Sequence, residues 1–95
     1  MDEVGFDGTL RAARGGGHVV AVDEALAASI GAKHMTRVRG RFGGTGYRSN
    51  LAKMHGTLYL GVHEATVQAA GVAIGDTVAI TMALDPDPRP SDRAG

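Results

Sequence analysis

Apolar and polar residues alternate along several short segments of the chain, which is the pattern of half-buried β-strands. Strands are predicted over residues 4–11, 18–22, 36–42, 47–51, 58–62 and 77–84. Within 36–42, alternate residues point to one side of the strand and three arginines to the other. The last strand has the same apolar phase. The residues predicted to form the core from these two strands are Val38, Phe42, Val78, Ile80 and Met82.

Two short helices are predicted, one after the second strand and one after the fifth. Asp23 stands at the N-cap of the first, where its carboxylate can accept from free amide groups. Gly31 and Gly71 follow the helices 24–30 and 63–70 as left-handed stops. Glycine-rich segments at 15–17 and 43–46 predict turns, the second in a hairpin. Residues 1–85 are predicted to form one domain, and residues 86–95, which are rich in proline and charge, a disordered tail.

The chain contains an internal repeat with a period of forty residues. Identical residues recur at six positions, namely Gly16/Gly56, Val22/Val62, Glu24/Glu64, Ala25/Ala65, Gly31/Gly71 and Val38/Val78. The predicted strand, capped helix, glycine stop and following strand therefore occur twice. Two such units cannot each bury an apolar face alone, and a closed barrel would remove their exposed edges. The predicted fold is a mostly β, closed barrel of the double-split type, with a pseudo-two-fold repeat and two short helices.

Charge is unevenly distributed, although ten basic and ten acidic residues give a formal net charge of zero. No acidic residue occurs between Glu24 and Glu64, whereas that stretch holds six arginines and lysines. There is no cysteine, so disulfides, thiolate metal ligands and cysteine nucleophiles are excluded. No apolar run is long enough to cross a membrane, and the N-terminal residues do not resemble a secretion signal. A cytoplasmic location without membrane association is expected.

The arginines are the most informative polar residues. Arg39 and Arg41 project from one face of their strand, and Arg48 and Ser49 belong to the next strand. This group is the candidate ligand-binding site, for an anionic ligand or an acidic protein partner. A solvated outer face is the alternative, since charged runs usually face water. The corresponding face of the last strand is small and uncharged, and a homodimer or another partner could cover it.

Other chemistry has weaker support in the sequence. The histidines lack the spacing that places two imidazoles on one helix face, and no metal site or cofactor is predicted. The glycine runs lack a phosphate-binding spacing, and turn formation explains them. No Gly-x-Ser-x-Gly motif or acid–base constellation is present, so no catalytic residues are assigned and an enzyme is not expected. The histidines are His18, His34, His55 and His63.

The order of these motifs resembles a family of small bacterial barrel domains of unknown function. The matching segments are Arg39-Gly-Arg-Phe42, Tyr47-Arg-Ser-Asn-Leu51 and the closing Gly75-Asp-Thr-Val78, and the resemblance extends over residues 4–89. Members occur alone or fused to YdeI/OmpD-associated-like domains with a suggested role in bacteriocin protection. The resemblance implies a barrel like that of the AbrB and MazE transcription factors, and it brings no catalytic residues.

The sequence leads to two principal hypotheses for function. The first is a non-enzymatic barrel that binds an anionic ligand or an acidic partner through its arginines. The second is an AbrB-like DNA-binding dimer, which rests on the resemblance in fold. Nucleic acid is not favoured, because a chain of zero net charge attracts a polyanion only weakly at long range. A small-molecule enzyme is a third and weaker alternative.

Overall fold

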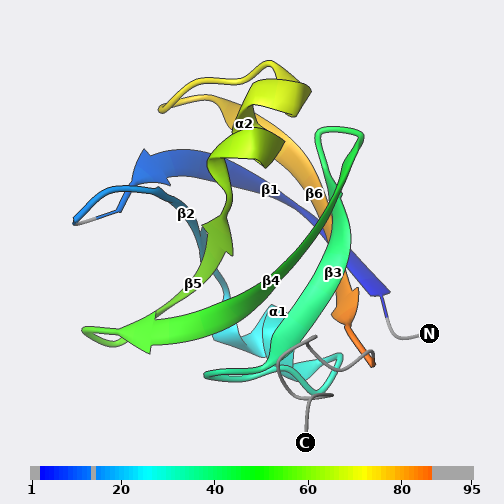
Figure 1. Ribbon diagram of the computed structural model, residues 1–95. Coiled ribbons are helices and arrows are strands. Elements are labelled where there is room, and N and C mark those ends of the chain that lie inside the picture. The colour runs from blue at the N-terminus through cyan, green and yellow to red at the C-terminus, as the bar shows by residue number, and fades with distance from the viewer. Residues whose placement is uncertain (1–2, 14, 87–95) are drawn as a thin grey trace, which may run out of the picture.

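The polypeptide closes into a barrel of six antiparallel strands (Figure 1). The computed structural model describes residues 3–13 and 15–86. Around the barrel the strands follow the order β1-β2-β5-β4-β3-β6, so that β1 pairs with β6 and completes the ring. The elements are β1 (Glu3–Ala12), β2 (His18–Val22), α1 (Glu24–Ala28), β3 (Arg37–Phe42), β4 (Thr45–Met54), β5 (Thr57–Val62), α2 (Glu64–Ala70) and β6 (Thr77–Leu84). The mostly β closed barrel with two short helices predicted from the sequence is confirmed.

Two long strands, β1 and β4, each change partner along their length. β1 pairs with β6 over residues 3–9 and with β2 over residues 10–12. In the same way, β4 pairs with β3 over residues 45–50 and with β5 over residues 51–54. These bent strands join the two sheets into one ring. The sequence prediction for β4, 47–51, was too short at both ends. At the C-terminal end, Ala52 and Lys53 have weak strand propensity, and pairing with β5 holds them extended.

The core fills the inside of the barrel mostly with aliphatic side chains, together with the aromatic rings of Phe42 and Tyr47. All five residues predicted for the core are buried, with Phe42 and Met82 at 1% and 0% exposure. On β1, Gly8 and Leu10 are buried and the intervening Thr9 is exposed, as the alternation of a half-buried strand requires. A side chain could not replace the hydrogen of Gly8, because a Cβ atom there would approach Val20 to 2.3 Å.

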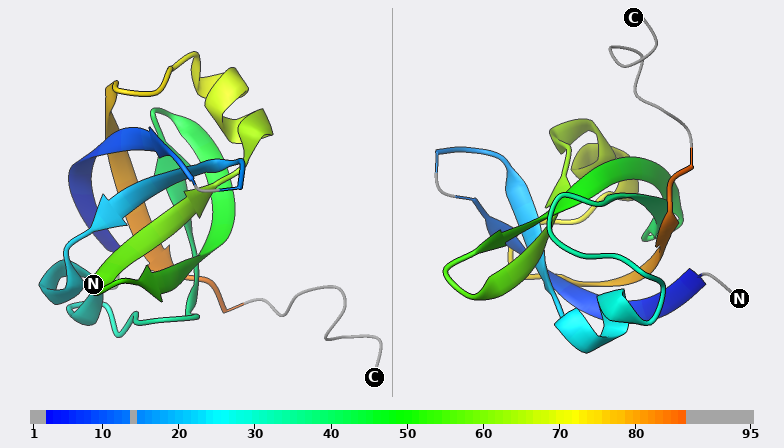
Figure 2. Two further views of the ribbon diagram at one scale, coloured as in Figure 1. Left: turned by 90° about the vertical axis from the view of Figure 1, so that its left-hand side faces the viewer. Right: turned by 90° about the horizontal axis from the view of Figure 1, so that it is seen from below.

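The helices lie at opposite ends of the barrel, as two views agree (Figures 1 and 2). Asp23 caps α1, where its Oδ1 accepts from the amide of Ala25 at 2.8 Å. The helix ends at Ala28, two residues earlier than predicted, because the Ser29 hydroxyl and the Gly31 amide each bond back three residues and tighten the last turn. α2 ends as predicted, with Gly71 in the left-handed conformation at φ 70°.

The turns after the two helices have matching hydrogen bonds. In the first, the amide of Lys33 donates to the Thr36 hydroxyl; in the second, the amide of Ala73 donates to the Asp76 carboxylate. Both turns also bond to the residue at which a long strand changes partner. Met35 and Thr36 bond to Leu51 of β4, and Gly75 and Asp76 bond to Leu10 of β1. Each turn therefore fixes the bend of one long strand.

The hairpin between β3 and β4 turns on two residues, Gly43 and Gly44, with φ of 58° and 89°. The predicted connection 43–46 was too long, since Thr45 and Gly46 already pair with β3. The predicted tail lies, apart from Pro86, outside the described residues. Within the described part of the chain, no helix is long and apolar enough to cross a membrane.

Candidate functional site

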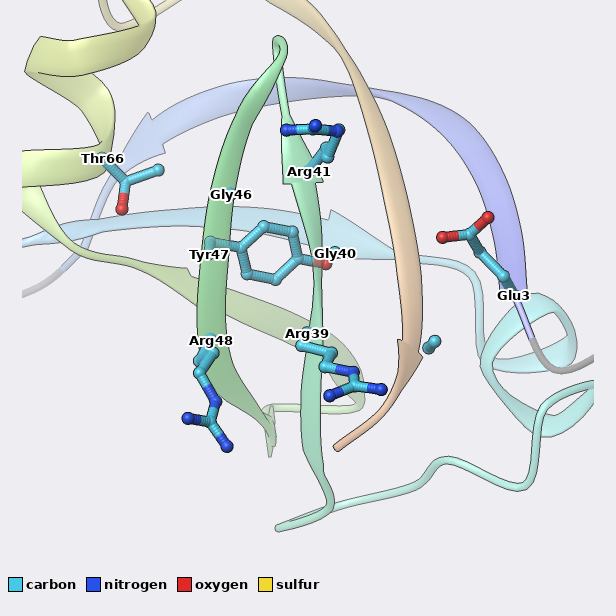
Figure 3. Close-up of a pocket in the computed structure, with 9 residues that line it drawn as sticks. Glu3, Arg39, Gly40, Arg41, Gly46, Tyr47, Arg48 and Thr66 are labelled. Atoms are coloured by element: carbon cyan, nitrogen blue, oxygen red, sulfur yellow. The ribbon is translucent and has the colours of Figure 1, made fainter. Parts of the chain in front are cut away.

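Three arginines from β3 and β4 lie side by side on the barrel, and we call Arg39, Arg41 and Arg48 the arginine face. Arg39 is the direct cross-strand partner of Arg48, whereas Arg41 lies opposite Gly46. All three residues are exposed. Figure 3 shows Arg39 and Arg48 directed toward one end of the strands and Arg41 near the hairpin at the other. The alternation of β3 therefore positions its arginines as predicted.

The arginine face surrounds an open depression with a volume of about 730 Å³. Gly40 and Gly46 contribute backbone only, and the Tyr47 ring lies beside Gly40 (Figure 3). Thr66 of α2 lies on one side and Glu3 of β1 on the other (Figure 3). The lining residues are Glu3, Arg39, Gly40, Arg41, Gly46, Tyr47, Arg48, Thr66 and Ala83.

Arg48 forms a two-pronged ion pair with Asp85, which follows the last residue of β6. Its Nε donates to Oδ2 at 2.8 Å and its Nη2 donates to Oδ1 at 3.0 Å. The Asp85 side chain has no exposed surface, whereas half of the Arg48 side chain is exposed. Because β3 lies between β4 and β6, the ion pair of Arg48 with Asp85 crosses over the end of β3. The backbone amide of Asp85 also bonds to the carbonyl of Arg37 at 3.1 Å.

A competing structural explanation for the arginines is that Glu64 or Asp76 folds back to pair with them. Both acids instead have local partners. The Glu64 carboxylate accepts from Gln68 within α2, and the Asp76 carboxylate accepts from the amide of Ala73. Asp85, which the sequence prediction placed at the end of the domain, pairs with Arg48, and Glu3 also lines the depression.

Two hydrogen bonds near the hairpin hold Arg41 in place. Its Nη1 donates to the carbonyl of Gly44 at 3.0 Å, and its backbone amide donates to the hydroxyl of Thr81 on β6 at 2.9 Å. The first bond orients the guanidinium at the hairpin end of the depression.

Tyr47 reaches from β4 across β3 to β6. Its hydroxyl donates to the carbonyl of Thr81 at 2.7 Å. Gly40, the cross-strand partner of Tyr47, permits this crossing, because a Cβ atom on Gly40 would lie 2.0 Å from the same carbonyl oxygen. Burial raises the pKa of Tyr47 far above its ordinary value, and the charge of Glu3 raises it further. The sequence analysis did not single out Tyr47 for this role, although an aromatic residue facing a glycine across a hairpin is a signal for such packing.

Ser49 is the predicted site residue that does not join the arginine face. Its side chain is buried, and its hydroxyl donates to the carbonyl of Gly61 on β5 at 2.7 Å. Ser49 shares the inward phase of Leu51, two residues further along β4, whereas Arg48 points outward. The alternation from Leu51 was the signal that could have placed it. Whether these residues bind a ligand remains a prediction.

Two of the histidines, His34 and His63, occupy structural positions in turns and caps. Nδ1 of His34 accepts from the amide of Lys53 at 2.8 Å. His63 occupies the N-cap of α2 but its side chain makes no capping hydrogen bond, unlike Asp23 in α1. Among the described residues, no group of three or more histidines and acids is placed to hold a metal ion.

Comparison with known proteins identifies the domain type but not its activity. A family model described as a domain of unknown function, DUF1905, matches residues 6–82. The match includes both helices, the arginine face and most of the barrel. None of the curated proteins matches the chain.

Proposed function

The chain belongs to the DUF1905 family of domains of unknown function, and we propose from its own geometry that it is a non-enzymatic binding module. Its arginine face receives an anionic ligand or an acidic protein partner. The observation that carries this proposal is the arrangement of Arg39, Arg41 and Arg48 around one open depression on paired strands. Guanidinium groups placed in this way suit two-pronged recognition of carboxylate or phosphate groups.

The pairing of β3 with β4 does not by itself require arginines on this face. Like charges directly opposite on adjacent strands are destabilising, and Arg39 lies directly opposite Arg48. Forty residues after Arg39 and Arg41, β6 carries the small and uncharged Ala79 and Thr81. β6 is nevertheless a fully formed strand of the same barrel. Asp85 offsets part of the repulsion at Arg48, and a bound anion would offset more of it.

The depression offers little for acid–base catalysis. Tyr47 is the phenol that lines it, and burial raises the pKa of this residue. Its hydroxyl proton is engaged by the Thr81 carbonyl. A group that holds its proton so firmly is poorly matched to proton transfer near neutral pH. This supports a binding role over an enzymatic one.

A titration of the folded protein with anions tests the proposal. Inorganic pyrophosphate and a hexaglutamate peptide serve as probes, and binding is followed by calorimetry and amide chemical shifts. Arg41→Gln is the informative variant, because Arg41 does not belong to the ion pair with Asp85. We expect it to weaken binding at least about threefold. Arg11→Gln, at an exposed position on β1, is the control and should leave affinity unchanged. No binding of either probe, or equal losses in both variants, would refute the proposal.

DNA binding by an AbrB-like dimer is separated from this function by salt. Affinity for a DNA duplex would fall steeply with salt, in proportion to the number of phosphates contacted. A short acidic peptide would show a shallower dependence, because few charges are neutralised. Sedimentation at the same protein concentrations would show whether a homodimer forms.

We further infer that the barrel is of the double-split type with an internal two-fold repeat. The support is the matching pair of turns, in which Met35 and Thr36 bond to Leu51 as Gly75 and Asp76 bond to Leu10. The pairings β2–β5 and β3–β6 also join equivalent strands. Superposition of residues 16–38 on 56–78 in an experimental structure is the test, and dissimilar backbones would contradict it.

A further inference from the structure

We infer that the arginine face is built for an extended acidic segment of a protein partner, and that Asp85 is the chain's own occupant of one end of this site. The inference rests on the proposed binding function and specifies its ligand. Asp85 already shows which chemistry the face accepts. Its carboxylate, carried on the stretch of chain that leaves β6, engages Arg48 through two parallel hydrogen bonds at 2.8 and 3.0 Å.

The spacing of the arginines fits an extended chain. Residues i and i+2 of a strand lie about 6–7 Å apart on the same face. Arg39 and Arg41 have this relation along β3. An extended segment with acidic residues at alternate positions presents its carboxylates at the same interval. Such a segment could lie along the strands, because Gly40 and Gly46 add no side chains to the depression, in which the Tyr47 ring lies between Arg48 and Gly40.

The intramolecular carboxylate sets a threshold for any external ligand. A tethered group competes at an effective concentration in the millimolar range. A ligand with one carboxylate therefore gains little by replacing Asp85 at Arg48. A segment with several acids can also engage Arg41, which stands at the hairpin end away from Asp85. The site thereby selects ligands with multiple, regularly spaced carboxylates over single anions.

Two five-residue peptides of equal charge test the spacing. One has acetyl-Glu-Ser-Glu-Ser-Glu-amide as its sequence, and the other has the three glutamates adjacent. We expect the alternating peptide to bind more tightly by about threefold or more. Equal affinities, or tighter binding of inorganic phosphate or a DNA duplex than of either peptide, would overturn the assignment to an acidic protein segment.

Removal of the internal carboxylate tests the competition. We expect Asp85→Asn to bind the alternating peptide about threefold to tenfold more tightly than the native chain. Glu24→Gln removes the carboxylate of the exposed ion pair with Lys53, neither member of which lines the depression, and should leave affinity unchanged. Thermal unfolding shows whether each variant is folded. In the native chain, the ¹³C signal of the Asp85 carboxylate should shift as peptide is added, which does not depend on any variant.

The outcomes separate this inference from the proposed function. If the peptides bind, and Arg41→Gln weakens them, but Asp85→Asn binds no more tightly and the Asp85 signal does not move, then the inference is wrong and the binding function stands. If no anion binds to the native chain or to Asp85→Asn, the proposed function is wrong as well.

Discussion

The barrel contains two strand–helix–strand units, β2–α1–β3 and β5–α2–β6. After its helix, each unit forms a similar turn with different side chains. Each unit needs a turn that follows its helix and fixes a bent strand. The first makes its internal bond to a threonine hydroxyl and the second to an aspartate carboxylate, at 3.0 and 2.9 Å. The backbone bonds to Leu51 and Leu10 are the same in both. Backbone geometry is thus shared where side-chain chemistry differs.

The difference between the units is greatest on their outer faces. β3 presents Arg39 and Arg41, whereas the residues forty positions later, on β6, are Ala79 and Thr81. The buried residues, by contrast, keep their phase in both strands. Because the fold accepts either kind of outer face, the arginines are not required for folding. The comparison therefore directs attention to β3 as the functional strand.

The largest expected effect is on the shared core. Phe42 and Met82 are forty residues apart and equally buried. We expect Phe42→Ala to lower the free energy of unfolding by about 3–5 kcal/mol and Met82→Ala by about 2–5 kcal/mol, because each leaves a cavity. Urea unfolding measures both. A loss below about 1 kcal/mol for either would show that the two units do not contribute comparably to one core.

The ion pair of Arg48 with Asp85 should matter more than the exposed pair of Lys53 with Glu24. We expect Arg48→Gln or Asp85→Asn to cost about 1–3 kcal/mol, since the buried carboxylate loses its partner or its charge. The figure is moderated by the half exposure of Arg48. Both members of the Lys53–Glu24 pair are about half exposed, and their coupling should stay below about 1 kcal/mol. Double-mutant cycles for the two pairs measure the contrast, and equal coupling energies would contradict it.

Tyr47 should make stability sensitive to alkaline pH. Its pKa is raised in the folded state, so the folded protein keeps a proton that the unfolded chain loses above about pH 10. The free energy of unfolding should therefore fall as the pH rises beyond that point. Tyr47→Phe should cost about 1–2 kcal/mol at neutral pH, through the lost bond to Thr81, and should remove this part of the alkaline decline.

Unfolding by urea at a series of pH values from 8 to 11 is the appropriate measurement for Tyr47. Tyr59→Phe is the matched control on β5 and should retain the decline of the native protein. A decline of equal size in Tyr47→Phe would show that another group is responsible.

The smallest effect is expected at the two turns. Met35 adopts a left-handed φ of 71°, whereas Gly75 adopts 98° at the equivalent position. A side chain at such an angle costs about 1 kcal/mol. We expect Met35→Gly to raise the free energy of unfolding by about 0.5–1 kcal/mol and Gly75→Ala to lower it by about 1 kcal/mol. Met35→Ala controls for the lost side chain. If Met35→Gly and Met35→Ala are equally stable, backbone strain does not distinguish the turns.

Much of the barrel was predictable because alternation reports directly on burial. The phase of Val38 and Phe42, or of Val78 and Ile80, decides which side of a strand faces the core, and these assignments were confirmed. Helix ends and strand ends were less predictable. They depend on local bonds such as that of the Ser29 hydroxyl, and on pairing with β5, which the residues of β4 do not reveal by themselves.

The contacts at the candidate site were less predictable than its charge. Arg39 lies beside Arg48, as their strand assignments suggested. The pairing of Arg48 with Asp85, however, requires the strand order β4-β3-β6, which alternation cannot supply. The same holds for the bond from Tyr47 to Thr81, which spans three strands. Long-range polar contacts follow from topology, and topology here depends on residues far apart in sequence.

The pairing of β1 with β6 also constrains the order in which the barrel can fold as the chain is synthesised. Glu3 is the cross-strand partner of Ala83, so the ring cannot close until nearly all of the described chain has left the ribosome. Only the β1–β2, β3–β4 and β4–β5 hairpins join neighbouring strands and can form early. Non-local pairing of this kind slows folding, because loop closure must precede the contacts that stabilise it. During translation, the edge of β1 that pairs with β6 therefore stays unpaired until β6 has been synthesised.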